Sequence, residues 1–384
     1  MGKSLSLLKD GTHGSYESVQ QGAWLLSAKN IINNRVVITS NDRKISENDF
    51  KKIHDKFQLR KGDVLLTIVG TIGRSAILKE ANKLTFQRSV AYLRPDENIL
   101  TSSNFLFSLS KSSNFQNQLK KRTVISAQPG IYLSDIDKLN ITIPELKEEQ
   151  DKIASIIITI DNILSLQQRK LKQLKQFKKA MLQQLFVDKN NKQPILRFKN
   201  FNENWEQHKL YEVADYRNGK AHEQHIFMHG NYIVVNSKFV STSGKKKKYS
   251  NKLIEPLMKN EIAFVLSDVP NGKALARTFL VKKSLKYSLN QRVAGITPHN
   301  NVNSYFLFIL MNRNPYFLKF DNGVSQTNLS KKDVEQFSEN YPTSCEQQKI
   351  GDIFKKLDFL ITLQQNKLTQ LTTLKKYLLQ KLFI

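Results

Sequence analysis

Three histidines, His222, His225 and His229, have the spacing of metal ligands. Structural zinc sites are usually completed by cysteine thiolates, and this chain has a single cysteine, Cys345. Cys345 opens an expected helix, where the helix dipole can stabilise a thiolate. Its counterparts in the first half of the chain are lysine and glutamate, so this position needs no thiol. The sequence therefore predicts neither a metal site nor a reactive cysteine.

Two further sets of residues resemble parts of catalytic motifs. Residues 314–317 (NPYF) resemble the tetrapeptide that holds the target amine in amino-methyltransferases, but the second proline is missing and no glycine-rich strand-to-helix loop precedes them. Pro95–Asp96 and residues 145–147 (ELK) have the composition of a restriction-type nuclease motif, yet they lie too far apart and the second part caps a helix. We predict a non-catalytic chain without cofactors of its own.

The chain carries a large positive charge, with 60 Lys+Arg against 33 Asp+Glu and a net charge of +27. Such an excess repels itself, so it indicates a polyanionic partner or an acidic membrane surface. The membrane is the weaker alternative, because no stretch approaches the roughly 18 apolar residues of a spanning helix. Residues 1–14 also lack the apolar core of a signal peptide. Together with the single cysteine, which excludes an internal disulfide, this predicts a cytoplasmic protein.

The chain contains a long internal repeat. Residues 149–186 return as residues 346–383, with matches that include Gln150/Gln347 and Asp161/Asp358. The repeat distance, 346 minus 149 or 197 positions, is far longer than that of a solenoid. Each repeating unit is therefore expected to be a globular domain followed by one long helix.

Apolar residues three and four positions apart give each repeated segment the a/d seam of helices that pack side by side. Both copies interrupt the seam with glutamine and later with lysine, Lys178 and Lys375. A polar seam residue costs stability but selects the register, so we predict that the two helices pair with each other. Alternatively, the glutamines face solvent and Phe177 and Leu374 take the core positions beside the lysines. The predicted pairing residues are Ile153, Ile157, Ile160, Leu164, Gln167, Leu171, Leu174, Ile350, Phe354, Leu357, Ile361, Gln364, Leu368 and Leu371.

The segment before each long helix alternates β-branched runs with turns and short helical patterns. Residues 62–70 and 89–95 correspond to residues 260–268 and 292–298. The predicted fold is α+β, with two similar mixed α/β domains separated by two long helices that pair as an antiparallel coiled coil. The predicted boundaries are 1–143 for the first domain, 144–187 for the central helix, 188–194 for a polar linker, 195–341 for the second domain and 342–384 for the C-terminal helix.

The two units differ at their start. Aligning residues 22–31 with 230–239 leaves the first unit without a counterpart of residues 194–208. The chain is therefore expected either to be shortened at its N-terminus or to receive this segment from elsewhere.

Five segments carry a resemblance to a known family: residues 9–16 (KDGTHGSY), 62–74 (GDVLLTIVGTIGR), 143–150 (IPELKEEQ), 194–221 (PILRFKNFNENWEQHKLYEVADYRNGKA) and 341–348 (YPTSCEQQ). With them the whole chain resembles the specificity subunit of type I restriction and modification systems. The resemblance implies a non-catalytic subunit whose two target recognition domains each read one half of a bipartite asymmetric DNA site. It also implies that the helices dock two methyltransferase subunits and that a motor-nuclease joins through the complex. S-adenosylmethionine, ATP and magnesium would then be bound by partner subunits alone.

Basic and amide side chains in loops are the candidates for contacts with double-stranded DNA, because they pair with phosphates and distinguish base edges. In the first domain these are His13, Arg74, Arg88, Lys121, Arg122 and Gln128. In the second domain they are Arg217, Lys220, Lys245, Lys246, Lys247, Lys248, Lys273, Arg292 and Gln326. Arg88 and Arg292 each follow a glutamine before a strand, so a buried structural role is the alternative for both. An ordinary solvated loop is the alternative for the lysine run.

A second function remains open at this point: a basic coiled-coil scaffold that binds RNA or non-specific DNA. Divergence between the two domains favours sequence reading, because a non-specific scaffold gains nothing from it. The seam from 153 to 185 would be about 50 Å long at roughly 1.5 Å per residue, enough to bridge one duplex turn of about 34–36 Å. The helices are therefore predicted to set the spacing between half-sites. The sequence does not tell which bases are read.

Overall fold

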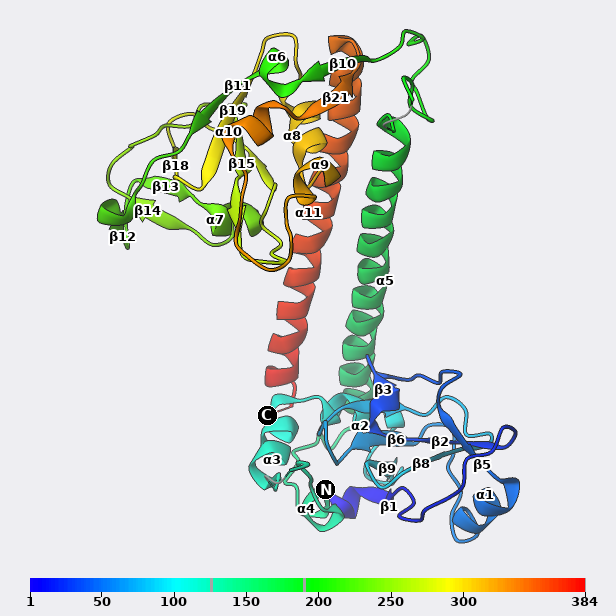
Figure 1. Cartoon of the computed structure of the whole chain (residues 1–384). Helices are drawn as coiled ribbons and strands as arrows, with labels where there is room; N and C mark the ends of the chain where they lie inside the picture. The colour runs from blue at the N-terminus through cyan, green and yellow to red at the C-terminus, as the bar shows by residue number, and fades with distance from the viewer. Residues whose placement is uncertain (125–126, 189–190, 384) are drawn as a thin grey trace. The chain divides into compact units, whose positions relative to one another are not determined.

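The computed structural model describes residues 1–124, 127–188 and 191–383, so two residues of the predicted linker, 189 and 190, lie outside the described part. The chain divides into two compact units (Figure 1). Unit 1 comprises Met1–Lys170 and Gln365–Ile384, and unit 2 comprises Leu171–Gln364. Each unit thus contains one globular domain and half of each long helix, α5 (Lys147–Leu185) and α11 (Ser344–Lys381).

The globular part of unit 1 is built on an antiparallel sheet with the strand order β1-β9-β6-β7. A smaller sheet has the order β5-β2-β8, in which β2 and β8 are parallel. The strands are β1 (Leu5–Asp10), β2 (Ala23–Leu26), β3 (Ile31–Ile32), β4 (Arg35–Val36), β5 (Arg43–Ile45), β6 (Val64–Thr67), β7 (Ser75–Ile77), β8 (Leu84–Phe86) and β9 (Val90–Pro95). The helices are η1 (Gly2–Ser4), η2 (Ala28–Asn30), α1 (Glu47–Ile53), α2 (Ser103–Ser110), α3 (Ser113–Arg122) and α4 (Leu133–Asp137).

Unit 2 repeats this plan. Its main sheet has the order β11-β19-β15-β17, and its second sheet, β12-β14-β13-β18, again contains one parallel pair, β13 and β18. The strands are β10 (Glu206–Lys209), β11 (Ala214–Asn218), β12 (Ile226–Phe227), β13 (Tyr232–Val235), β14 (Lys248–Ser250), β15 (Ile262–Val265), β16 (Ser267–Asp268), β17 (Thr278–Leu280), β18 (Tyr287–Leu289), β19 (Val293–Pro298), β20 (Thr327–Asn328) and β21 (Ser338–Tyr341). The helices are α6 (Leu210–Val213), η3 (Glu223–His225), α7 (Ser237–Ser241), α8 (Ser304–Met311), α9 (Pro315–Leu318) and α10 (Lys331–Glu335).

Strand β6 is apolar and buried on both faces. Because successive side chains of a strand point to opposite faces, Val64 and Leu66 enter the core cluster that contains α2 and α3, whereas Leu65 enters the cluster formed with the second sheet. Strand β15 divides its side chains in the same way, with Phe264 in one cluster and Val265 in the other. Each main sheet therefore lies between two hydrophobic cores.

A repeated glutamine anchors the start of each long helix. The Gln150 side chain accepts a hydrogen bond from the Thr101 backbone N–H at 3.0 Å and donates to the Pro144 carbonyl at 2.9 Å. Gln347 likewise accepts from the Asn303 N–H at 3.0 Å and donates to the Pro342 carbonyl at 2.8 Å. Both glutamines are buried, so the start of each long helix is tied to the residues that precede α2 in unit 1 and α8 in unit 2.

The two long helices pack together in an antiparallel pair, as the seam predicted. In unit 1 the Lys375 ammonium pairs with Asp161, and in unit 2 Lys178 pairs with Asp358 at 2.5 Å. These are the repeated seam lysines, each bound to the repeated aspartate of the other helix. Phe177 and Leu374 remain about half exposed, at 52% and 46%, so the alternative in which they fill the core beside the lysines is not the one observed.

Candidate nucleic-acid interface

In unit 1, backbone hydrogen bonds join four loops that lie far apart in the sequence. The Arg88 N–H donates to the Thr12 carbonyl at 3.0 Å, and the Ile68 N–H donates to the Ser89 carbonyl at 2.9 Å. The Gly70 N–H donates to the Pro129 carbonyl at 2.8 Å. We call the loops 11–13, 68–74, 87–89 and 128–131 the loop edge of unit 1.

Four predicted DNA-contact residues lie on this loop edge, and all four are exposed: His13, Arg74, Arg88 and Gln128. Arg74 follows Gly73, whose φ of +86° belongs to the left-handed region that glycine adopts readily. A Cβ at Gly73 would also lie 2.4 Å from the Gln116 side-chain oxygen, which would have to move. The His13 ring lies 2.7 Å from the Asp10 carboxylate.

Unit 2 joins the corresponding loops by three bonds that match those from the Thr12 N–H to Phe86, from the Ile68 N–H to Ser89 and from the Ile131 N–H to Ile68 in unit 1. The Lys220 N–H donates to the Leu289 carbonyl at 3.0 Å, and the Leu266 N–H donates to the Arg292 carbonyl at 3.1 Å. The Leu329 N–H donates to the Leu266 carbonyl at 2.9 Å. We call the loops 219–221, 266–273, 289–292 and 326–329 the loop edge of unit 2.

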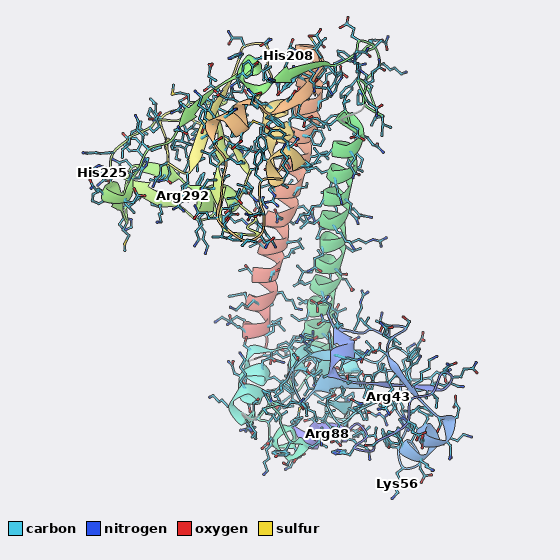
Figure 2. The ribbon with its side chains drawn as sticks, viewed as in Figure 1. Arg43, Lys56, Arg88, His208, His225 and Arg292 are labelled. Carbon is cyan, nitrogen blue, oxygen red and sulfur yellow. The ribbon has the colours of Figure 1, made fainter. Side chains whose placement is uncertain are left out.

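The loop edge of unit 2 carries four predicted residues, Lys220, Lys273, Arg292 and Gln326, and all are exposed. Gln326 donates from its side chain to the Ser267 hydroxyl at 2.9 Å, and the Lys220 ammonium lies 2.9 Å from Glu255. Arg88 and Arg292 are labelled among the side chains in Figure 2. The two edges therefore share a backbone pattern and present different exposed side chains.

The recurring Gln-Arg pair is displaced by one residue between the units. The Ser89 carbonyl accepts from the Ile68 N–H just after β6, and the Arg292 carbonyl accepts from the Leu266 N–H just after β15. Ser89, not Arg88, is therefore the counterpart of Arg292. The structural counterpart of Arg88 is Gln291, an exposed residue that the sequence reasoning did not select. Its side chain donates to Glu223 at 2.6 Å. Aligning the two strands on Val90 and Val293 would have identified it.

Arg217 lies on β11 and is engaged with acidic groups. Its guanidinium donates to Glu261 at 3.0 and 2.9 Å, also pairs with Glu255, and donates to the Pro256 carbonyl at 2.7 Å. Although burial favours the neutral acid, Lys220 and Arg217 hold the pKa of Glu255 below its usual range. Arg217 thus has fewer donors to offer a ligand than Lys220, which is exposed.

The remaining predicted contact residues lie outside the two loop edges. Lys121 and Arg122 occupy the last turn of α3, where positive charge complements the helix dipole. The Arg122 side chain donates to the Gln118 side chain and to the Lys138 carbonyl, each at 3.4 Å. The lysines 245–248 run from the end of α7 into β14, and all four are exposed.

The histidine group does not form a metal site. His222 is buried, with one ring nitrogen 2.7 Å from the Lys220 carbonyl and the other 2.6 Å from the Ser288 hydroxyl. Burial lowers the pKa of His222, which keeps the ring neutral. Among the residues that the structure describes, no group of three or more His, Cys, Asp or Glu side chains could hold a metal ion.

The chain has two domains of one fold, each with a loop edge that carries exposed basic and amide side chains. Comparison with protein families identifies the family to which these two domains belong. The family model described as the type I restriction modification DNA specificity domain matches residues 18–176 and 202–373. The chain belongs to this family. It is a DNA specificity subunit of a type I restriction-modification system, a non-catalytic component whose complex acts on DNA and whose cofactors are borne by partner subunits.

Individual relatives match different shares of the chain. The chain is 24% identical to the MjaX type I restriction enzyme specificity subunit of Methanocaldococcus jannaschii, over 85% of this chain and 79% of the relative. It is 28% identical to the Escherichia coli EcoBI specificity subunit, over 30% of this chain and 26% of the relative.

Solved structures share the fold. The specificity subunit from M. genitalium superposes with a TM-score of 0.66 at 18% identity, covering 99% of this chain and 94% of that one. A chain from a structure of type I complex assembly and conformational transition has a TM-score of 0.55 at 14% identity, covering 99% and 95%. No helix within the described residues is long and apolar enough to cross a membrane.

Proposed function

We propose that each unit reads one half of a bipartite, asymmetric DNA target through its loop edge. The observation that carries this proposal is the shared backbone pattern of the two edges together with their different exposed side chains. The side chains proposed to contact DNA are His13, Arg74, Arg88, Gln128, Lys220, Lys273, Arg292 and Gln326, with Lys121, Arg122, Arg217 and lysines 245–248 as flanking contacts. Arginine, lysine and glutamine supply the donors that distinguish base edges and neutralise phosphates.

The long helices are proposed to set the spacing between the half-sites and to dock partners. Both carry exposed polar residues at repeated positions: Gln168/Gln365, Lys170/Lys367 and Gln173/Gln370. Two copies of one methyltransferase subunit would bind such repeated surfaces with approximate two-fold symmetry. The motor-nuclease would join through this complex, with S-adenosylmethionine, ATP and magnesium bound by the partners. The complex is proposed to work in the cytoplasm, where a chain with one cysteine needs no disulfide.

Methylome sequencing of cells that carry loop-edge variants tests the division of reading. Lys273→Ala with Arg292→Ala should relax the half-site read by unit 2 and leave the other half-site unchanged, and Arg74→Ala with Arg88→Ala should do the reverse. Lys61→Ala and Lys259→Ala are matched controls, because both are exposed lysines in turns before β6 and β15, at the ends opposite the loop edges. A pair of variants that relaxes both half-sites equally would contradict the proposal.

Insertion of one heptad into each long helix tests the spacing role. Seven residues lengthen a helix by about 10 Å at 1.5 Å per residue, roughly three base pairs of ~3.4 Å each. The half-site sequences should stay constant while their separation grows, with some loss of affinity from the added duplex rotation. A changed half-site at constant spacing would show that the helices are not the measuring element.

A further inference from the structure

One loop at the edge of unit 2 is longer than its counterpart in unit 1. Residues 266–277 connect β15 to β17, and residues 68–74 connect β6 to β7, so the loop has twelve residues in unit 2 and seven in unit 1. In unit 1 the apolar residues Val69 and Ile72 of this loop pack against the core. In unit 2 the loop carries Val269, which is 62% exposed. The longer loop thus presents an apolar side chain to solvent.

A second exposed valine lies on the neighbouring loop of the same unit. Strands β16 and β20 pair antiparallel, so the chain leaves β16 at Val269 on the side where it enters β20 from Gln326. The Asn271 side chain donates to the Gly323 carbonyl at 3.3 Å, which joins the two loops beyond these strands. Val324 follows Gly323 and is 85% exposed. Two exposed valines therefore lie on loops that are hydrogen-bonded to each other.

The Asp268 carboxylate fixes the backbone around Val269. One of its oxygens accepts from the Val269 N–H at 2.9 Å, and the other accepts from the N–H groups of Ala274 and Leu275 at 2.6 and 3.1 Å. The Gly272 N–H donates to the Val269 carbonyl at 2.9 Å, which closes a turn. Val269 is therefore held on an ordered loop although its side chain is exposed.

Val324 is held in a similar way by a polar side chain. The Asn322 side-chain oxygen accepts from the Val324 N–H at 3.0 Å and from the Ser325 N–H at 3.1 Å. A loop that is fixed before binding loses less conformational entropy when it binds. Both valines are therefore preorganised for contact with a ligand.

The surroundings of the valines are basic and polar. Lys273, Arg292 and Gln326 belong to the loop edge of unit 2 and are exposed, and their side chains donate hydrogen bonds that suit phosphates and base edges. Valine side chains neither donate nor accept a hydrogen bond. In the major groove, the apolar group that a base edge presents is the C5-methyl group of thymine. An ordered valine on a DNA-reading surface therefore matches this methyl group.

We propose that Val269 and Val324 are specificity-determining residues that contact the C5-methyl group of a thymine in the half-site read by unit 2. This inference rests on the proposed DNA-reading role of the loop edge, and it names a chemical group that the edge reads. Contact buries the methyl group against the valines, whereas cytosine and uracil present only a C5–H there. Unit 2 therefore discriminates against a pyrimidine that lacks the methyl group.

Uracil substitution tests the contact, because deoxyuridine keeps the base pairing of thymidine and lacks only its C5-methyl group. The half-site of unit 2 is the one that Lys273→Ala with Arg292→Ala relaxes in the methylome. Each thymine of this half-site, on either strand, is replaced singly by uracil in a synthetic duplex, and the affinity of the purified complex is measured. Affinity should fall about fourfold at one or two positions, as expected for one methyl group removed from an apolar contact.

Threonine variants assign the effect to the valines. Threonine has the shape of valine with a hydroxyl in place of one methyl group. Val269→Thr combined with Val324→Thr should reduce the difference between thymine and uracil to less than about twofold, because residues in contact are energetically coupled. Val37→Thr, at an exposed valine outside both loop edges, is the matched control and should keep the difference of the intact complex.

The outcomes separate this inference from the proposed function. A loss of affinity on uracil substitution that the two threonine replacements leave undiminished would assign the methyl contact to other residues and overturn the proposal. A half-site without thymine, or with no thymine at which uracil weakens binding, would overturn it as well. A response to 5-methylcytosine in place of cytosine, with none to uracil, would overturn the assignment to thymine. If Lys273→Ala with Arg292→Ala relaxes neither half-site, the proposed function fails; if it relaxes one and uracil has no effect there, only this inference fails.

Discussion

The two units bury an equivalent carboxylate and pair it with arginines from different strands. In unit 1, Asp63 before β6 accepts from Arg94 of β9 at 2.7 and 2.8 Å. In unit 2, Glu261 before β15 accepts from Arg217 of β11 at 3.0 and 2.9 Å. Both carboxylates are nearly inaccessible to solvent. A buried charge needs a partner, but the partner's position along the chain is free to differ.

A glycine explains why the arginine differs in position. Arg217 reaches Glu261 across β19, and a Cβ at Gly295 would lie 3.1 Å from the Arg217 Nε. The counterpart of Gly295 in unit 1 is Tyr92, whose fully buried ring occupies that path. In unit 1 the arginine that pairs with Asp63 therefore comes from β9 itself, as Arg94. The position of the arginine therefore depends on the residue between it and the carboxylate, which is Gly295 in unit 2 and Tyr92 in unit 1.

Removal of Arg217 should have the largest effect on stability. Arg217→Ala leaves Glu261 buried without its cation, so the free energy of unfolding of unit 2 should fall by about 3 kcal/mol. Lys9→Ala, at the equivalent position on β1, is the matched control and should cost less than about 1 kcal/mol, since the Lys9 ammonium lies over the Phe57 ring and is paired with no carboxylate among the described residues. Chemical denaturation of both variants measures the difference. Equal losses would break the comparison.

Moving the arginine of unit 2 to the position that it has in unit 1 tests whether either strand can supply the cation for the buried carboxylate. Arg217→Lys with Thr297→Arg gives unit 2 the residues found at Lys9 and Arg94 in unit 1. The Thr297 hydroxyl already donates to Glu261 at 3.0 Å, so an arginine there starts within reach. The double variant should recover about 1–2 kcal/mol relative to Arg217→Lys alone, as a coupled pair does. No recovery would show that β19 cannot supply the cation.

Alkaline pH should stabilise unit 1 more than unit 2. Burial, together with Lys375, lowers the pKa of Lys111 to about 8, whereas its counterpart in unit 2 is the uncharged Asn312. Between pH 8 and pH 10 the unfolded chain holds a proton on Lys111 that the folded unit has released, so stability rises with pH. The gain should be about 2 kcal/mol, and Lys111→Met should abolish it. The measurement is the denaturation midpoint of each unit at pH 8 and pH 10, with amide exchange reporting on each unit separately.

The lysine run should have a smaller effect, confined to phosphate contacts. Lysines 245–248 follow α7 and end at the first residue of β14, whereas the corresponding segment of unit 1, residues 31–42, contains one basic residue, Arg35. Replacing the four lysines with glutamine should reduce the slope of log affinity against log salt by about 0.9 for each contacting lysine. The slope of the intact chain is expected to be about −5, for six neutralised phosphates. An unchanged slope would assign this run to an ordinary solvated loop.

Local pattern determined much of the architecture. The repeat predicted two units, the alternation of apolar residues predicted β6 and β15, and the heptad seam predicted the pairing of α5 and α11. These features depend on side-chain periodicity along a few turns or strands, which a sequence displays directly. The seam positions of Lys178 and Lys375 were visible in the same way.

Only the tertiary structure determines which residues distant in the sequence pair with each other. The repeat places Lys178 and Asp358 in a seam, but their pairing depends on the antiparallel approach of two helices, since 180 positions separate them. The strand register likewise matches Arg292 to Ser89, against the apparent Gln-Arg pairs. Arg217 and Lys220 lie three residues apart and are both basic. Arg217 turns into an ion-pair network because Gly295 leaves it room, and Lys220 remains exposed at the loop edge, a difference that no local pattern encodes.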